Sequence, residues 1–327
     1  MRKRNLLLVA GACLATLSLT VGSAVADPNG DPQFRQLVGV GAQTTQGLMN
    51  ALSDIITIGG VKVIGSYDNG PPGQITTKAP PANCTITRPN QGGAGLNALI
   101  ASKQAGDGCV QFARVVANDS ANRPGTGLVY IPAAVDALTY AIRDDSSISR
   151  KLSLSSLTAI YNCQVPNFKP LLGVFGAGNR TFFLQKLGIT DAPDLVTQPG
   201  HTCIKDTDST GAPLLANDGT LLTDPQQIVT YSSGPYLAQV NQVVPDRHGK
   251  AVLGSIDGIS PAVLNNDSVM SRDVYNVIDK AKLNDPTTNT VFVGSGSAVC
   301  TNVATIKRQG FNVNPNCGST TIQSTGP

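Results

Sequence analysis

Hydrophobic positions along the chain fall into short continuous runs and into longer stretches with one apolar face. The run at 37–41 is typical of a buried strand, and the next stretch, up to residue 56, carries apolar side chains every three or four residues, as a helix does. The same patterns predict further strands at 110–116, 128–132 leading on to 135–142, 252–256, 274–277 and 291–293, and further helices at 96–105, 153–161, 180–187, 235–243 and 297–309, with loops at 66–95 and 188–227. Strands that alternate with helices predict an α/β fold.

Three of the predicted helices begin at glycine-containing turns. The first follows Gly41 and starts at Thr44 and Thr45, the second follows the turn 92–95, and the third follows the turn 176–179. The first turn of a helix carries backbone N–H groups without intrahelical acceptors and the positive end of the helix dipole, so it attracts anions. The sequence therefore predicts anion-binding positions at these turns, gathered at the carboxyl edges of sheets.

Residues 1–26 have the pattern of a secretory signal peptide. Three basic residues precede an apolar run from residue 6 to residue 21, and the small-residue tripeptide Ala24-Val25-Ala26 ends the segment. We expect cleavage before Asp27 and secretion of the mature chain. Lipidation at Cys13 is the alternative, but the apolar stretch before it is shorter than a signal sequence needs. No second apolar stretch reaches the roughly 18 residues of a membrane span.

Removal of this segment leaves a formally neutral chain. It leaves 21 basic side chains against 21 acidic ones, and charged residues make up only 14% of the sequence. Because nucleic-acid binding depends on a basic surface, no nucleic-acid partner is expected. All the acidic residues are Asp, since the sequence contains no Glu. Mechanisms that need a Glu base, such as that of a His-Glu-x-x-His zinc site, are therefore excluded.

Six cysteines remain after the signal segment, and an even number in an exported chain is typical of disulfides. Six cysteines allow many connectivities, but their grouping along the chain favours the local pairs Cys84–Cys109, Cys163–Cys203 and Cys300–Cys317. A metal site would need closer cysteines or partner histidines, and the chain has only His201 and His248. We therefore expect neither a metal nor another cofactor.

Several longer segments, taken in order, resemble one protein family. They include VGVGAQTTQGLMNAL (38–52), GGAGLNAL (92–99), QFAR (111–114), GLVYIPAAVDALTYAIR (127–143), GVFGAGNRTFFLQKLGI (173–189), SSGPYLAQVNQVV (232–244) and LGSIDGISP (253–261). From about residue 38 to residue 311 the chain resembles the substrate-binding proteins of phosphate ABC transporters, in the form common in actinobacteria.

The resemblance implies a two-lobe type II periplasmic-binding-protein fold with a ligand cleft between the lobes. By position, lobe 1 comprises residues 27–131 and 249–327, and lobe 2 comprises residues 132–248. In such proteins, backbone N–H groups and hydroxyls at helix N-termini hold the anion, which agrees with the glycine-containing turns. The resemblance further implies phosphate or another small oxyanion as ligand and an ABC permease as partner.

The resemblance places ligand-binding positions in four segments. They are Thr44 and Thr45; Gly93, Ala94 and Gly95; Arg114; and Gly176, Ala177, Gly178, Asn179 and Arg180. The chain departs from the family at Ala94, Ala177 and Asn179, which stand where relatives carry hydroxyl-bearing residues, and Val115 and Val116 follow Arg114 where relatives have serines. These departures predict an eroded phosphate pocket.

Each candidate also has a structural interpretation. Thr44 and Thr45 suit a helix cap, and Gly93 and Gly95 suit a turn with positive φ. Arg114, in a mostly apolar strand, needs a partner once buried, and an ion pair with an Asp would supply one. The side chain of Arg180 is either an anion clamp or part of a helix surface.

Together these observations favour a secreted, non-catalytic solute-binding protein. The chain has no Gly-x-Ser-x-Gly elbow, and neither histidine lies in a motif expected at the cleft, so no activated nucleophile is predicted. A phosphatase-like enzyme remains as the catalytic alternative. An extracellular structural or interaction protein that keeps the fold without a transport role is the other, and the missing hydroxyls and the missing lipid anchor favour it over import.

Overall fold

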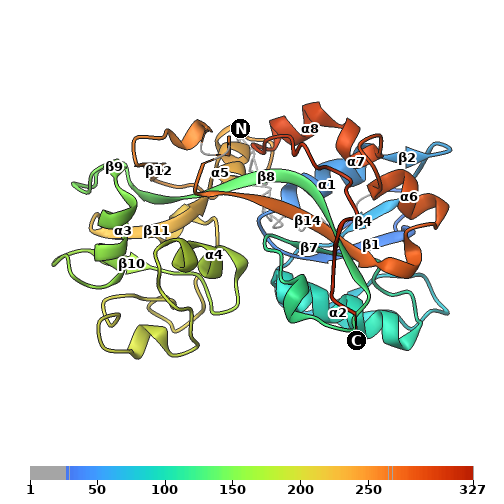
Figure 1. Cartoon of the computed structure of the whole chain (residues 1–327), viewed down its shortest axis with the longest axis horizontal. Coiled ribbons are helices and arrows are strands. Elements are labelled where there is room, and N and C mark those ends of the chain that lie inside the picture. The colour runs from blue at the N-terminus through green and yellow to red at the C-terminus, as the bar shows by residue number, and fades with distance from the viewer. Residues whose placement is uncertain (1–26, 29, 264, 267, 327) are drawn as a thin grey trace, which may run out of the picture.

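The computed structural model describes residues 27–28, 30–263, 265–266 and 268–326. The predicted signal segment and Cys13 lie outside the described residues. Two lobes lie side by side, and the long strands β8 (Leu128–Arg143) and β14 (Ser271–Asp279) run from one lobe into the other (Figure 1). The two strands are antiparallel and pair along the whole of β14. They are therefore the connection on which the relative position of the lobes depends.

Lobe 1 contains the parallel strands β1 (Leu37–Gly41), β4 (Ile64–Ser66) and β7 (Phe112–Val115), and β14 pairs antiparallel with β7. All five residues of β1 are buried, because helices cover both faces of the sheet. The helices of lobe 1 are α1 (Gln46–Ile55), α2 (Gly92–Ala105), α6 (Pro286–Phe292), α7 (Ala298–Thr301) and α8 (Val303–Arg308). Leu48 of α1 packs in one core with Phe292 and Ile306, and Leu96 of α2 packs in the other.

Lobe 2 is built on the second half of β8. The strands β11 (Gln227–Ser232) and β12 (Ala251–Leu253) pair antiparallel with β8, and β10 (Lys169–Leu171) pairs parallel with β11. Its helices are α3 (Leu154–Tyr161), α4 (Gly178–Lys186) and α5 (Ser233–Val240). The hydroxyl of Ser153 caps α3 by accepting from the N–H of Ser156, as the sequence pattern predicted.

Short elements complete the structure. They are the strands β2 (Thr57–Ile58), β3 (Val61–Lys62), β5 (Gln74–Thr76), β6 (Thr85–Thr87), β9 (Lys151–Leu152), β13 (Ser255–Ile256) and β15 (Ile322–Gln323), and the 3-10 turns at Ser120–Asn122, Leu195–Thr197, Gly219–Leu221, Pro261–Val263 and Lys280–Lys282. The hairpin of β5 and β6 lies in the segment 66–95, which the sequence pattern predicted to be a loop.

Two predicted elements of the C-terminal part are wrong. Residues 291–293 were expected to form a strand. Instead, residues 291 and 292 are the last two of the helix α6, and residue 293 follows the helix. Asp285 accepts from the N–H of Thr288 and Pro286 occupies the first helical position, so a capped helix start outweighs the apolar pattern. The helix expected over 297–309 is divided at Asn302 into α7 and α8.

The return from lobe 2 to lobe 1 lies later in the chain than predicted. Residues from 249 onward were assigned to lobe 1, but β12 pairs with β8 in lobe 2, and Met270 packs in the same core as Leu157. The chain crosses back through β14 because Arg272 and its neighbours pair with the middle of β8. The division of the chain into two domains is otherwise still a prediction.

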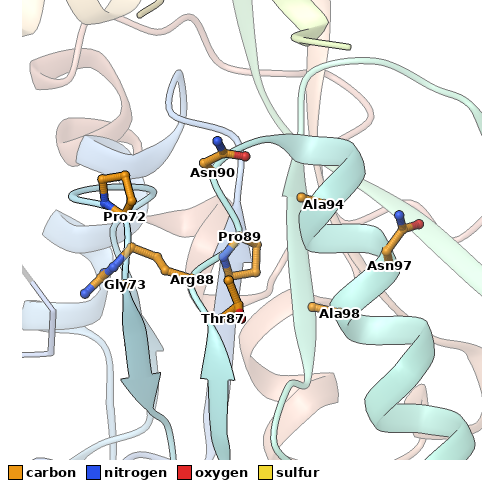
Figure 2. A pocket seen from close by; sticks show the side chains of 9 residues that line it. All are labelled: Pro72, Gly73, Thr87, Arg88, Pro89, Asn90, Ala94, Asn97 and Ala98. Atoms are coloured by element: carbon orange, nitrogen blue, oxygen red, sulfur yellow. The ribbon is translucent and has the colours of Figure 1, made fainter. Parts of the chain in front are cut away.

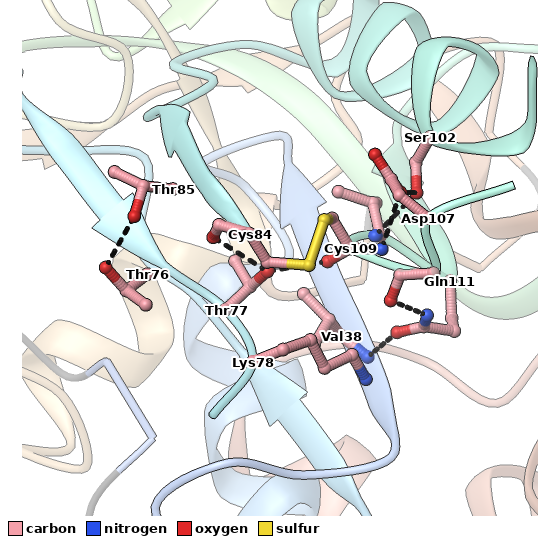
Figure 3. Close-up of a disulfide and its surroundings, with 12 residues drawn as sticks. Val38, Thr76, Thr77, Lys78, Cys84, Thr85, Ser102, Asp107, Cys109 and Gln111 are labelled. Carbon is pink, nitrogen blue, oxygen red and sulfur yellow. Dashed lines mark hydrogen bonds between the residues drawn. A yellow bond between two sulfur atoms is a disulfide. The ribbon is translucent and has the colours of Figure 1, made fainter. Parts of the chain in front are cut away.

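Three disulfides link the predicted cysteine pairs Cys84–Cys109, Cys163–Cys203 and Cys300–Cys317. The first joins the β5–β6 hairpin to the segment between α2 and β7 (Figure 3). Beside it, the hydroxyl of Thr77 donates to the carbonyl oxygen of Cys109 at 2.8 Å, which strengthens the same connection. Each disulfide lies within one lobe, so none of the three restrains the lobes against each other.

Candidate functional site

The starts of three predicted helices meet at the junction of the two lobes. Thr44, just before α1, donates from Oγ1 to Oδ1 of Asn179 in α4 at 3.0 Å. A Cβ atom placed on Gly178 would lie 2.4 Å from Cγ2 of Val116 in lobe 1, and one placed on Gly176 would lie 3.2 Å from Oε1 of Gln91, just before α2. The starts of α1, α2 and α4 therefore approach one another across the junction, as the glycine-containing turns predicted.

Asn179 is the centre of a buried hydrogen-bond network. Its Oδ1 atom accepts from Thr44 and, at 2.6 Å, from Nη2 of Arg272. Its Nδ2 atom lies 3.1 Å from Oγ of Ser232 and 3.3 Å from Oδ1 of Asn217. Asn217 in turn donates from Nδ2 to Oγ1 of Thr44 at 3.3 Å. The side chains of these five residues are buried and connect lobe 1, lobe 2 and the crossing strand β14.

The cation of this network is Arg272. Its Nη2 atom also lies 2.9 Å from Oδ2 of Asp136, and its Nη1 atom donates to the carbonyl oxygen of Gly178 at 3.3 Å. Burial lowers the pKa of Arg272, and the neighbouring Asp136 opposes that effect. The second carboxylate oxygen of Asp136 accepts from the N–H of Gly234 at the start of α5. The start of α5 therefore points at this ion pair.

Sequence reasoning missed four members of the network, namely Asp136, Asn217, Ser232 and Arg272. Asp136 lies within the long apolar run of β8, and Arg272 comes two residues before the predicted strand at 274–277. A lone acid and a lone base in two neighbouring apolar strands are a signal for a buried ion pair, because neither charge is stable there without a partner. Asn217 lies in a loop and has a positive φ, and no sequence pattern marks it as a member of the network.

Two further hydroxyls at helix starts are buried. Oγ1 of Thr45 and Oγ of Ser233 have no hydrogen-bond partner among the described residues. Thr45 occupies the position before α1 without capping it, and the hydroxyl of Thr44 bonds to Asn179 instead. The two threonines therefore do not act as the helix caps that the structural interpretation expected.

Arg114 is completely buried in β7 and is held within lobe 1. It donates to Oγ of Ser66 at 2.8 Å and to the carbonyl oxygen of Tyr67 at 2.6 Å. Burial lowers its pKa to about 10. Carbonyl and hydroxyl oxygens, and not the Asp that the structural interpretation expected, thus accept its hydrogen bonds. Ligand contact by Arg114 stays a prediction, and these contacts favour a structural role.

Arg180 is likewise buried, within lobe 2. Its Nε atom lies 2.8 Å from Oδ1 of Asp191, and its Nη1 atom lies 3.0 Å from Oδ2 of Asp206. Its Nη2 atom donates to the carbonyl oxygen of Ala192. The interpretation of Arg180 as a helix-surface residue is wrong. Its role as an anion clamp stays a prediction, and the guanidinium already contacts two carboxylates.

Gly93, Ala94 and Gly95 lie in the first turn of α2, which begins earlier than expected. Neither glycine has positive φ, so the expectation of turn glycines is wrong for both. A Cβ atom on Gly95 would lie 2.7 Å from the Cα atom of Gly41, and Gly95 therefore lets α2 approach the end of β1. Ala177 is the residue before α4 and makes no side-chain capping bond, and its place in a ligand site stays a prediction.

A pocket of about 440 Å³ lies on lobe 1, beside the start of α2. Figure 2 shows it between the β5–β6 hairpin and α2. Its lining residues are Pro72, Gly73, Thr87, Arg88, Pro89, Asn90, Ala94, Asn97 and Ala98. Of the predicted ligand-binding residues only Ala94 faces this pocket, so it does not bring the candidate site together.

The disulfides bear on the location of the protein. Disulfides persist in oxidising compartments outside the cytoplasm, and three of them in one chain fit an extracytoplasmic protein. Within the described part of the chain, no helix combines the length and the apolar character that a membrane crossing requires.

Comparison with solved structures identifies the fold, whereas comparison with sequences does not. No family model and no curated protein matches the chain. A solved structure from Clostridium perfringens, described as a phosphate ABC transporter substrate-binding protein with bound phosphate, has a TM-score of 0.55 and 15% identity over 85% of this chain and 99% of that one. An ABC-type phosphate transport receptor from Vibrio cholerae has a TM-score of 0.51 and 14% identity over 85% of this chain and 100% of that one. The chain therefore has the mixed α/β fold of type II phosphate-binding proteins, which confirms the predicted fold class.

Proposed function

We propose that the chain is an exported, non-catalytic protein of the solute-binding type, and that its interlobe site does not bind phosphate tightly. The observation that carries the proposal is the meeting of the starts of α1, α2 and α4 at the junction of the lobes. Solute-binding proteins with two lobes bind their ligand between them. The two solved structures named above are described as a phosphate ABC transporter substrate-binding protein with bound phosphate and as an ABC-type phosphate transport receptor, which supports a small oxyanion as the ligand class for which the interlobe site is built.

Weak phosphate binding follows from the groups that are missing. Each charge-assisted hydrogen bond to a desolvated anion contributes roughly 1.5–3 kcal/mol. The residues Ala94, Ala177 and Asn179 replace three hydroxyls of the resembled family, so the loss amounts to several kcal/mol, or about two to four orders of magnitude in affinity. Arg180 and Arg272 do not offset it, because carboxylates already neutralise both of them.

A second candidate is an extracellular interaction protein that keeps the fold without a transport role. Direct contact between the lobes favours it: Thr44 bonds to Asn179, and Gly178 lies against Val116. Such contacts keep the lobes together through side chains of the protein itself. The solute-binding proposal has three further parts. We propose that the protein is exported, that it is of the form common in actinobacteria, and that an ABC permease is its partner.

Isothermal titration of the ligand-stripped mature protein tests the proposal. Phosphate, sulfate and acetate are titrated at one pH and ionic strength. We expect no phosphate binding tighter than about 10 µM, given the lost bonds. A sub-micromolar phosphate constant would show that other groups compensate for the missing hydroxyls. Co-purification of a permease from the native membrane would favour the solute-binding role over the interaction role.

A further inference from the structure

The side-chain amide of Asn179 is held as a bound ligand would be. Its oxygen accepts from a hydroxyl of lobe 1, that of Thr44 at 3.0 Å, and from the guanidinium of Arg272 at 2.6 Å. Its nitrogen has Ser232 and Asn217 of lobe 2 as partners, at 3.1 and 3.3 Å. The amide is thus enclosed by polar groups from both lobes and from the strand between them, and each of its two polar atoms has two partners.

These partners can also receive an anion. Thr44 and Arg272 already donate towards the amide oxygen. The hydroxyl of Ser232 can rotate to donate, since a hydroxyl hydrogen adapts to its partner. The amide of Asn217 keeps its orientation, because its Oδ1 atom accepts from the backbone N–H of Ser232 at 2.9 Å and its Nδ2 atom donates to Thr44. Thr44, Arg272 and Ser232 then donate towards one position. The start of α5 adds positive potential there, because Ser232 is the residue before this helix.

The shape of the position selects the class of anion. A side-chain amide is planar, with its oxygen and nitrogen on one carbon, and a carboxylate or nitrate has the same planar arrangement with oxygens in both places. A tetrahedral phosphate or sulfate carries further oxygens out of this plane and does not match the planar arrangement. The carboxylate of Asp136 repels a dianion more strongly than a monoanion.

We infer that the Asn179 amide occupies the anion position of the interlobe site as a tethered, neutral ligand, and that this position is built for a small planar monoanion such as acetate or nitrate. The inference rests on the proposed function, because it takes the junction as the solute site. It names Asn179 as the residue that prevents anion binding in the natural chain, and Thr44 and Arg272 as the donors that an anion would use.

The test is to remove the tethered amide and supply free ligands. The Asn179→Ala protein is titrated with sodium acetate, sodium nitrate, sodium phosphate and neutral acetamide at constant ionic strength, with calorimetry and thermal unfolding as readouts. We expect saturable binding of acetate or nitrate with a dissociation constant of about 1 mM, the range open to so small a ligand, and at least tenfold weaker binding of phosphate. The wild-type protein should bind neither planar anion measurably.

Two controls make the result specific. Asn314→Ala removes another buried asparagine, one that donates to Asp273 far from Asn179 along the chain, and it should gain no anion binding. Adding Thr44→Val to Asn179→Ala should weaken acetate binding at least tenfold. If Asn179→Ala does not fold, Asn179→Ser, which keeps a small polar side chain, takes its place.

Each outcome bears on the inference. Binding of acetamide without binding of acetate or nitrate would overturn it, since the position would then only accommodate an amide. A folded variant that binds none of these ligands would also overturn it while leaving the proposed function intact. Tight phosphate binding by the wild-type protein would instead contradict the proposed function.

Discussion

Asp136 of β8 and Arg272 of β14 lie directly opposite each other in the register of the two crossing strands, and their charged groups are 2.9 Å apart. Both side chains are buried, with 0% and 3% of their surface exposed. Removing one partner of a buried pair leaves the other charge without compensation, which costs about 3–5 kcal/mol. We therefore expect Asp136→Ala to lower the free energy of unfolding by that amount in urea titrations.

An exposed ion pair provides the control for this prediction. Lys62 and Asp54 lie 3.2 Å apart, and the Asp54 side chain is 59% exposed. Exposed pairs contribute about 0–1 kcal/mol, so Asp54→Ala should change stability little. Equal losses in the two variants would show that the pair on the crossing strands is not specially important.

The disulfide between Cys84 and Cys109 should stabilise lobe 1. It closes a loop whose ends are 25 positions apart. In the chain-entropy model a loop of this size contributes about 3 kcal/mol, mainly by restricting the unfolded chain. The double substitution of both cysteines by Ala should lower the midpoint of thermal unfolding accordingly. Thiol labelling of the native, unreduced protein should find no reactive cysteine, and labelling of two or more would contradict the disulfide framework.

Periodicity was sufficient for the elements that carry the fold. The run at 37–41 became β1, and the apolar face that begins at Leu48 became that of α1, because burial on one or both faces leaves a direct trace in the sequence. Short hairpins such as β5–β6 leave almost none, since three residues per strand do not establish a period. The helix α6 was missed because the three apolar residues 291–293 were interpreted as a strand and the start signal Asp285-Pro286 was not considered.

The candidate site was predictable only in part. Thr44 and Asn179 lie at helix starts that the glycine pattern marks, and the structure brings these two together. Their partners Ser232 and Arg272 come from distant parts of the chain, and only the pairing of β8 with β11 and β14 places them beside Asn179. Local patterns contain no information about such pairing, so a contact across the lobes requires the structure.

Lys78 makes stability depend on pH in the alkaline range. Burial lowers its pKa from 10.5 to about 8, and its Nζ atom donates to the carbonyl oxygens of Arg35 and Gln36 beside the first disulfide (Figure 3). Between pH 8 and 10.5 the unfolded chain retains a proton that the folded chain releases, so the free energy of unfolding rises with pH.

Urea titrations of the wild-type protein and of Lys78→Gln between pH 7 and pH 10 measure this effect. Other titrating groups are common to both proteins and cancel in the difference. The stability of the wild type relative to the variant should increase by on the order of 1 kcal/mol over this range, after allowance for partial exposure. A difference that stays constant, or falls with pH, would contradict the lowered pKa.

The mature chain is predicted to begin at Asp27, after Ala24-Val25-Ala26. Intact-mass measurement of the protein from its own culture medium should give the mass of residues 27–327 with three disulfides. In the structure, Asp27 is held by Arg88, with Nη1 to Oδ1 at 2.6 Å and Nη2 to Oδ2 at 2.8 Å. A diacylglyceryl adduct on Cys13 would contradict both the cleavage site and free secretion.

Gly178 allows α4 of lobe 2 to lie against lobe 1. A Cβ atom at this position would lie 2.4 Å from Cγ2 of Val116, which is closer than two carbon atoms tolerate. Gly178→Ala should therefore destabilise the contact by about 1–3 kcal/mol or push the lobes apart, which small-angle scattering detects as a larger radius of gyration. Gly93→Ala is the control at another helix start, since a Cβ atom there would meet nothing within 4 Å.

A double-mutant cycle with Val116→Ala separates this contact from other effects of the new methyl group. Removal of the valine methyls takes away the atom that the methyl group introduced by Gly178→Ala would strike, so the combined variant should be more stable than the sum of the two single changes predicts, by about 1–2 kcal/mol. Its radius of gyration should return to the wild-type value. Additive losses, with no coupling between the two positions, would mean that the lobes do not press together at Gly178, and the tethered Asn179 next to it would then lack the close interlobe packing on which its contact with Thr44 depends.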